Sequence, residues 1–234
     1  MKGWAEVRLC SLVLALAPGA LAGHRLEVQR VAFNPAGTQV LMVAAGQLDG
    51  SGFSAAALQV VDTASGQTLR RANFQSSTLE VPQAVTALLR REETALRRWQ
   101  LWPGRTSTPV FRRRFPVRAP AWSEGVQAGS QQTVWARVWS RPLPVKLNVF
   151  PLLVRCAYGD QLPAGEGPAG VALRINGQPL VQDRTLSVDR QCAARYALER
   201  LDVQGNRVAA VLRVYTPGFE GPNAEPLLVA GQLR

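Results

Sequence analysis

The stretch VAFNPAGTQVLMVAAGQLDGSGFSAAALQVVD, residues 31–62, decides the fold because it alternates short apolar runs with turn signals. Val40–Ala45 is apolar throughout, which indicates a central strand buried on both faces. Asn34-Pro35-Ala36-Gly37 before it forms a turn, since proline suits the second turn position and glycine the last. Asp49–Gly52 is a flexible loop, and Leu58–Asp62 is the next strand. The stretch therefore predicts consecutive antiparallel strands.

Short segments on either side extend this pattern. A strand with a break in its phase runs from Leu26 to Phe33, and a turn at Thr63–Gly66 leads into a strand at Gln67–Arg71. Residues 23–71 thus form a β-meander whose order resembles a single blade of a β-propeller. A propeller needs at least about four blades. Nothing later in the chain repeats the pattern, so a complete ring is not supported.

One long amphipathic helix follows the meander. Ser77 and Glu80 have the spacing of a capping box, and Pro82 suits a first helical turn. Glu93 and Arg97 stand four residues apart with the acid first, the better order for a surface ion pair. Pro103-Gly104 ends the helix. Apolar residues recur at helical spacing at Val85, Leu88, Leu89, Leu96 and Trp99.

The remainder of the chain is again β-rich, and the whole is mainly β (α+β). Residues 103–130 form an irregular basic connection with one short strand at Val110–Val117, and residues 131–234 form an antiparallel β-sheet or sandwich. We therefore expect a β-meander plus helix at 23–102 and a C-terminal β domain at 131–234. The strands of the second domain are expected at Thr133–Ser140, Val145–Val154, Val171–Ile175, Leu180–Val181, Tyr196–Val203, Arg207–Tyr215 and Leu227–Ala230, with Asn176-Gly177 as a hairpin turn.

The first 22 residues are typical of an export signal. A basic start precedes the apolar run Leu9–Ala17, and small residues place the cleavage between Ala22 and Gly23. The run is about half the length of a membrane-spanning helix. We therefore expect a mature chain of 212 residues that has no transmembrane anchor and is periplasmic or extracellular.

Two cysteines remain after this cleavage, Cys156 and Cys192. An even count in an oxidising compartment predicts one disulfide, which would stabilise the fold by roughly 4 kcal/mol. Two buried free thiols are the alternative. Cys10 lies inside the leader, at the start of its apolar run, so a lipid anchor is not indicated.

The sequence argues against most catalytic chemistry. His24 is the sole histidine and lies close to the expected mature terminus, so serine or cysteine triads and histidine-based zinc sites are not expected. No phosphate-binding loop is present, and we expect no cofactor or metal. Two loop carboxylates would suffice for a small glycan-cleaving hydrolase, which is the alternative function. The candidates are Asp49, Asp183, Asp189 and Glu220, although such residues more often cap turns.

Trp135, Arg137 and Trp139 form the most specific local arrangement. At a period of two they share one face of a strand, where the guanidinium could stack between the indoles. One interpretation is an exposed platform for a sugar ring or another flat ligand. Because large aromatic side chains in β-proteins usually serve the core, we favour a ladder that the helix covers through Trp99 and Leu96.

Basic residues accumulate on the helix end and the connection after it. The formal net charge of the chain is +11, and residues 90–118 alone carry +7, all from arginine. A solvated face is the simpler interpretation. As a contact surface, Arg112, Arg113, Arg114 and Arg118 would bind an anionic envelope polymer or lipid headgroups. Nucleic acid is not the expected partner, because no nucleic-acid-binding motif accompanies the charge. The full set is Arg90, Arg91, Arg97, Arg98, Arg105, Arg112, Arg113, Arg114 and Arg118, against Glu92 and Glu93.

Several short segments resemble a bacterial family of predicted secreted proteins of unknown function. They are Phe33-Asn-Pro-x-Gly37, Asp49-Gly-Ser-Gly-Phe53, Val61-Asp62, the segment from Cys192 to Tyr196, and Gly218-Phe-Glu-Gly-Pro222. The chain departs from this pattern at Ala44-Ala45 and at Asn223-Ala224-Glu225. The resemblance implies export and a β-rich body, and it implies no activity. We therefore expect a non-catalytic binding or structural module of the cell envelope with a basic contact surface.

Overall fold

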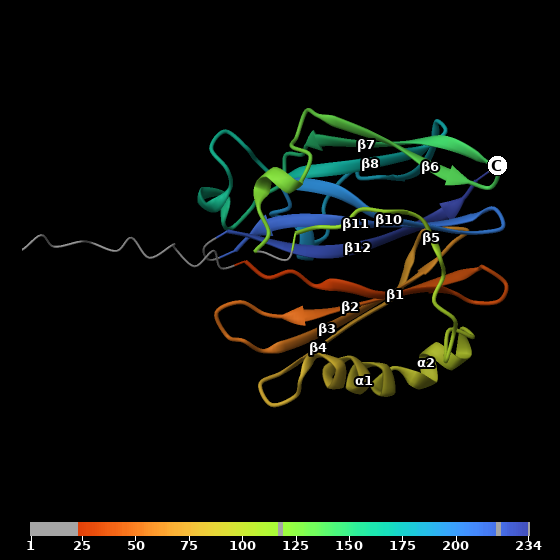
Figure 1. The fold of residues 1–234 in the computed structure, drawn as a ribbon. Helices are drawn as coiled ribbons and strands as arrows, with labels where there is room; N and C mark the ends of the chain where they lie inside the picture. The colour runs from red at the N-terminus through yellow and green to blue at the C-terminus, as the bar shows by residue number, and fades with distance from the viewer. Residues whose placement is uncertain (1–22, 117–118, 219–220, 234) are drawn as a thin grey trace, which may run out of the picture.

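The computed structural model describes residues 23–116, 119–218 and 221–233, so the predicted leader lies outside the described residues. In the described residues, three four-stranded antiparallel sheets and two α-helices are stacked in four layers (Figure 1). The helices cover the first sheet, the first sheet packs on the second, and the second packs on the third. The chain is therefore mainly β.

The first sheet has the strand order β1-β2-β3-β4, as a meander requires. Its strands are β1 (Glu27–Phe33), β2 (Gln39–Gln47), β3 (Ser54–Asp62) and β4 (Thr68–Ser76). The predicted break in phase of the first strand is a β-bulge between Val28 and Arg30. The structure confirms the meander but not its likeness to a propeller blade.

The strand β2 is buried on both faces, as its apolar sequence predicts. Leu41 and Val43 face the helices, whereas Val40 and Met42 face the second sheet. This double burial follows from the period of two in a strand, because successive side chains point to opposite faces.

Two helices replace the single long helix that the spacing predicts. They are α1 (Val81–Arg91) and α2 (Glu93–Arg98), separated at Glu92. The capping box is made by Glu80 and Gln83, one helical turn later than the predicted pair Ser77 and Glu80. The ion pair between Glu93 and Arg97 is present, with 2.6 Å between its closest atoms.

The C-terminal region forms a sandwich of two sheets. The second sheet has the order β12-β11-β10-β5, and the third has the order β6-β7-β8-β9. Because β5 pairs with β10, part of the predicted connection 103–130 belongs to this sandwich. The strands are β5 (Pro109–Arg112), β6 (Gln131–Val138), β7 (Arg141–Pro151), β8 (Ala169–Ile175), β9 (Gln178–Gln182), β10 (Arg195–Gln204), β11 (Arg207–Pro217) and β12 (Pro222–Gln232).

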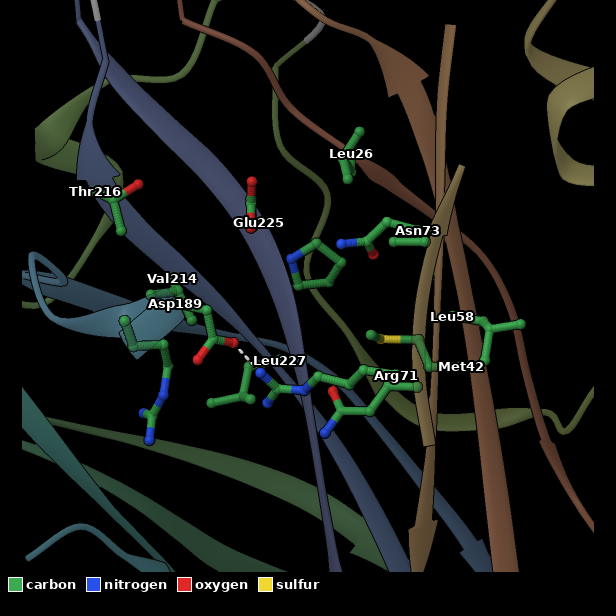
Figure 2. Close-up of a pocket in the computed structure, with 14 residues that line it drawn as sticks. Leu26, Met42, Leu58, Arg71, Asn73, Asp189, Val214, Thr216, Glu225 and Leu227 are labelled. Atoms are coloured by element: carbon green, nitrogen blue, oxygen red, sulfur yellow. Dashed lines mark hydrogen bonds and ion pairs between the residues drawn. The ribbon is translucent and has the colours of Figure 1, made fainter. Parts of the chain in front are cut away.

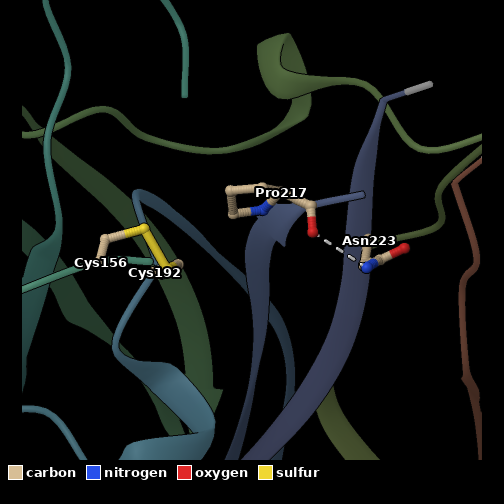
Figure 3. Close-up of a disulfide and its surroundings, with 4 residues drawn as sticks. All are labelled: Cys156, Cys192, Pro217 and Asn223. Carbon is tan, nitrogen blue, oxygen red and sulfur yellow. Dashed lines mark hydrogen bonds between the residues drawn. A yellow bond between two sulfur atoms is a disulfide. The ribbon is translucent and has the colours of Figure 1, made fainter. Parts of the chain in front are cut away.

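The predicted disulfide is present between Cys156 and Cys192, whose Cα atoms are 4.9 Å apart (Figure 3). It links the segment that follows β7 to the segment that precedes β10. Near it, Asn223 of β12 donates a hydrogen bond to the carbonyl of Pro217 of β11 at 3.1 Å.

Candidate binding surface

The outer face of the third sheet, β6-β7-β8-β9, is exposed to solvent. Its inner face buries Ala136 and Val138 against the second sheet, so the alternate residues Trp135 and Arg137 point outward. Trp135 is 66% exposed. The predicted ladder covered by the helix is therefore wrong.

The helices are on the opposite side of the molecule from this face (Figure 1). Leu96 is fully buried with Leu41 and Leu58 of the first sheet. A short connection joins β4 to α1, and consecutive elements usually pack together, so the helix buries its apolar side on the meander that precedes it.

Strand pairing adds two further cations to the outer face. Thr133 is opposite Lys146, and Lys146 is opposite Arg174, so these three residues form one row across β6, β7 and β8. Lys146 and Arg174 are both exposed. These two cations were not predicted from the sequence, because only the register shows that they share a face with Trp135 and Arg137.

The four strands of this sheet contain no aspartate or glutamate. The sequence has no acidic residue between Glu124 and Asp160. The cations of the outer face are therefore not neutralised by carboxylates of their own strands. Guanidinium and ammonium groups can bind the anionic groups of a ligand while an exposed indole beside them stacks on a ring of the same ligand.

Trp139 lies one residue beyond the end of β6, in the turn before β7, with a positive φ of 57°. Its indole nitrogen donates a hydrogen bond to the carbonyl of Gly205 at 2.8 Å. This contact joins the β6–β7 turn to the β10–β11 turn. Half of the Trp139 side chain remains exposed at this junction.

The predicted arginines of the connection are not part of the outer face. In the strand pairing, Arg112 of β5 is opposite Arg200 of β10. Its neighbour Phe111 packs toward the third sheet, so Arg112 is on the other face of its own sheet. Arg113 lies over the ring of Phe115 at 4.9 Å. Arg114 is exposed, and Arg118 lies outside the described residues.

The other arginines of the predicted cluster are also dispersed. Arg91 donates to the carbonyl of Asn73 at 2.8 Å, and Arg97 pairs with Glu93. Both lie on the helices. The charge of residues 90–118 is therefore spread over several surfaces of the fold.

A buried group of charges surrounds Phe115. Arg25 binds both carboxylate oxygens of Glu124, and the guanidinium groups of Arg25 and Arg213 lie 5.0 and 5.5 Å from the Phe115 ring. Burial raises the pKa of Glu199, although Arg213, 2.7 Å away, opposes this shift. This group was not predictable from the sequence, since its members are far apart in the chain.

Three of the four candidate loop carboxylates have hydrogen-bond partners in the fold. Asp183 pairs with Arg190 at 2.8 Å, and its side chain is 7% exposed. Asp189 pairs with Arg71 (Figure 2). Asp49 accepts a hydrogen bond from the amide of Gly50, and Glu220 lies outside the described residues.

The cavity beside Asp189 is small. It lies between the first and second sheets, and its volume is about 100 Å³ (Figure 2). Small-molecule sites usually have volumes of about 300–1,000 Å³. Glu225, another acid of its lining, is within 3.2 Å of the His24 ring. This cavity therefore does not provide a free acid pair with room for a glycan between its members.

Among the described residues, no three side chains of histidine, cysteine, aspartate or glutamate are grouped as a metal site would need. Neither helix in the described part of the chain has the length and apolar character required to cross a bilayer.

These features define a class of protein with four layers, mainly β, and an outer sheet face that is basic, aromatic and free of acids. Residues 42–232 match the family model described as "Predicted secreted protein (DUF2259)", and the chain belongs to this family, so it is exported. The predicted resemblance is thus confirmed. Neither a curated protein nor a solved structure shows significant similarity to the chain.

Proposed function

We propose that the protein is a non-catalytic binding module that contacts an anionic polymer of the cell envelope through the outer face of the third sheet. One observation supports this most strongly. Trp135, Arg137, Lys146 and Arg174 face solvent together on a sheet whose strands carry no carboxylate. The proposal includes removal of the leader before Gly23 and a periplasmic or extracellular location.

A polymer suits this face better than a small ligand does. The face is a sheet surface rather than a pocket, so its affinity has to come from several weak contacts along an extended ligand. Trp135 offers a flat apolar ring on which a sugar can lie, and the neighbouring cations attract the acidic groups of the same chain. Lipid headgroups carry similar charges but do not need an exposed indole on the face of a sheet.

The glycan-cleaving alternative has less support. General acid catalysis and nucleophilic attack need two carboxyl groups that face one substrate. Asp183 and Asp189 are instead paired with arginines. We therefore propose binding without a reaction.

Affinity electrophoresis of the full chain tests the proposal. A native gel containing polygalacturonate should retard the protein, whereas a gel containing neutral dextran should not. Trp135→Ala and Arg137→Gln should each weaken the retardation several-fold, and added salt should weaken it further because exposed charges are screened.

Arg90→Gln is the matched control, since it removes one exposed arginine from α1 on the opposite side of the molecule. If it weakens binding as much as Arg137→Gln does, net charge rather than the sheet face is responsible and the proposal fails. Binding to vesicles that contain phosphatidylglycerol, without binding to the polymer, would identify headgroups as the ligand instead.

A further inference from the structure

A large groove lies at one end of the molecule, separate from the sheet face. Its volume is about 850 Å³, within the range of small-molecule sites. Three segments that are distant in the sequence surround it: the β1–β2 turn, the end of β10, and the chain between α2 and β5. Figure 1 shows these segments together at the right-hand end of the view.

The lining combines an aromatic ring, cations and neutral polar groups. Trp102 is half-buried in it. Arg97 and Arg105 contribute guanidinium groups, of which that of Arg97 is already paired with Glu93. None of the fourteen lining residues is acidic. Three neutral polar residues of the lining are exposed, namely Gln100, Thr106 and Thr108. The amides of Asn34 and Gln204 and the Ser107 hydroxyl also line it but are hydrogen-bonded within the fold.

Hydrogen bonds fix the walls of the groove on both sides. The Gln204 amide donates to the carbonyls of Asn34 and Pro35 at 3.2 and 3.0 Å, which ties β10 to the β1–β2 turn. Arg30 donates to the carbonyls of Pro103 and Gly104 and so holds the segment after α2. Walls that are already ordered lower the entropic cost of binding a ligand.

The floor of the groove is also held in place. Ser107 donates from its hydroxyl to Asp202 at 2.7 Å and from its amide to the carbonyl of Val31 at 2.8 Å. Arg200 binds the same aspartate and the carbonyl of Ser107. At Gly104, a β-carbon would lie 2.8 Å from the carbonyl oxygen of Leu101, so the chain there has no room for a side chain.

From this lining we infer that the groove binds a short acidic oligosaccharide, and specifically an end of the polymer that contacts the sheet face. An indole stacks on the apolar face of a sugar ring, amides and hydroxyls bind its hydroxyl groups, and arginine binds its carboxylate. The inference rests on the proposed function. Trp139 connects the two sites, because it binds Gly205, the neighbour of the lining residue Gln204.

Isothermal titration calorimetry of the full chain with trigalacturonate tests this inference, with neutral maltotriose as the comparison ligand. We expect the acidic trimer to bind and the neutral trimer to bind at least about tenfold more weakly. The loss of one charge-assisted hydrogen bond is enough for a difference in affinity of this size. Arg105→Gln should weaken trigalacturonate binding by a similar factor. Arg98→Gln, which removes an exposed arginine of α2 outside the lining, should leave it within about twofold.

Trp102 also packs against the core of the first sheet, so replacement by a small residue could unfold the protein. Trp102→Phe is therefore used, and the thermal unfolding of this variant is compared with that of the parent. A folded Trp102→Phe protein should bind the trimer more weakly, because the smaller ring offers less stacking area.

The groove inference fails if trigalacturonate does not bind, or if Arg105→Gln and Trp102→Phe bind it like the parent. The proposed function fails separately, if Trp135→Ala and Arg137→Gln do not alter retardation by the polymer. Trp135→Ala should leave trimer binding unchanged, so failure of the groove inference can be distinguished from failure of the proposed function.

Discussion

Glu92 is the residue that divides the predicted helix in two. Its side chain is only 4% exposed and accepts hydrogen bonds from Arg70 on β4, at 2.8 and 3.1 Å. Because the carboxylate reaches toward the sheet, the backbone at Glu92 leaves the helical region, with φ −96° and ψ 3°. The hydrogen bonds from the Arg70 guanidinium lower the pKa of Glu92 below its ordinary value.

Replacement of Glu92 by glutamine should lower the melting temperature at neutral pH. A carboxyl whose pKa is lowered by folding stabilises the fold at pH values above 4.5, its ordinary pKa. This stabilisation is lost as the pH falls through the pKa of the carboxyl in the folded protein. The difference between Glu92→Gln and the parent should therefore be largest near pH 7 and shrink below about pH 4.5. Thermal unfolding followed by circular dichroism from pH 3 to pH 8 measures it.

Glu93→Gln is the control for this experiment. Glu93 forms an exposed pair with Arg97 within one helix, and such pairs contribute little to stability. An equal loss of stability in both variants, or a difference at Glu92 that does not change with pH, would contradict the role of the buried carboxylate.

The two glutamates also show what the sequence can predict at this scale. The pair between Glu93 and Arg97 follows from a spacing of four residues and was predictable. The partner of Glu92 is 22 residues earlier in the chain, on a strand. Only the packing of the helix on the first sheet brings them together.

At the scale of elements, turns were predictable because their chemistry is local. Asn176 and Gly177 have positive φ values of 49° and 83°, which suit the predicted tight hairpin. Gly37 closes its predicted turn with φ of 68°. Strand length is set by the partner instead: β4 extends to Ser76, beyond the predicted end at Arg71, because Ser76 pairs with Ser54.

The exposed face of β6 was not predictable in this way. Alternation assigned Trp135 and Arg137 to one face and Val134 and Ala136 to the other, but it did not say which face is covered. That depends on where the helices pack. The groove was missed for the same reason, since its lining comes from three separate segments.

The disulfide is the element-scale feature with the clearest energetic consequence. Cys156 and Cys192 are 36 residues apart, and closing a loop of that length should stabilise the fold by roughly 4 kcal/mol. Urea unfolding with and without reductant should show this loss in the free energy of unfolding. A Cys156→Ser, Cys192→Ser double variant should be insensitive to reductant. Equal midpoints for the oxidised and reduced parent would contradict the expected contribution.

At the scale of the whole molecule, the N-terminal and C-terminal regions share a core. Val40 and Met42 of β2 are buried together with Val211 of β11 and Leu228 of β12. Gln59 of β3 strengthens this contact. Its side-chain amide donates to the carbonyl of Leu228 at 3.1 Å and accepts from the Leu228 amide at 3.0 Å.

Gln59→Leu should therefore destabilise the whole protein rather than the first sheet alone. The substitution leaves two buried backbone groups of Leu228 without the partners they have in the parent, which should cost about 2–4 kcal/mol. Gln75→Leu, at an exposed position of β4, should change stability by less than about 0.5 kcal/mol.

Urea unfolding followed by both tryptophan fluorescence and far-ultraviolet circular dichroism measures this effect. Because the two regions share buried side chains, the two signals should change together, and Gln59→Leu should move one common midpoint to lower urea concentration. Two separate transitions, of which Gln59→Leu shifts only one, would mean that residues 23–102 and 131–234 fold independently, as the predicted domain boundaries imply. In that case, the contact through Gln59 would join two stable units instead of forming part of one.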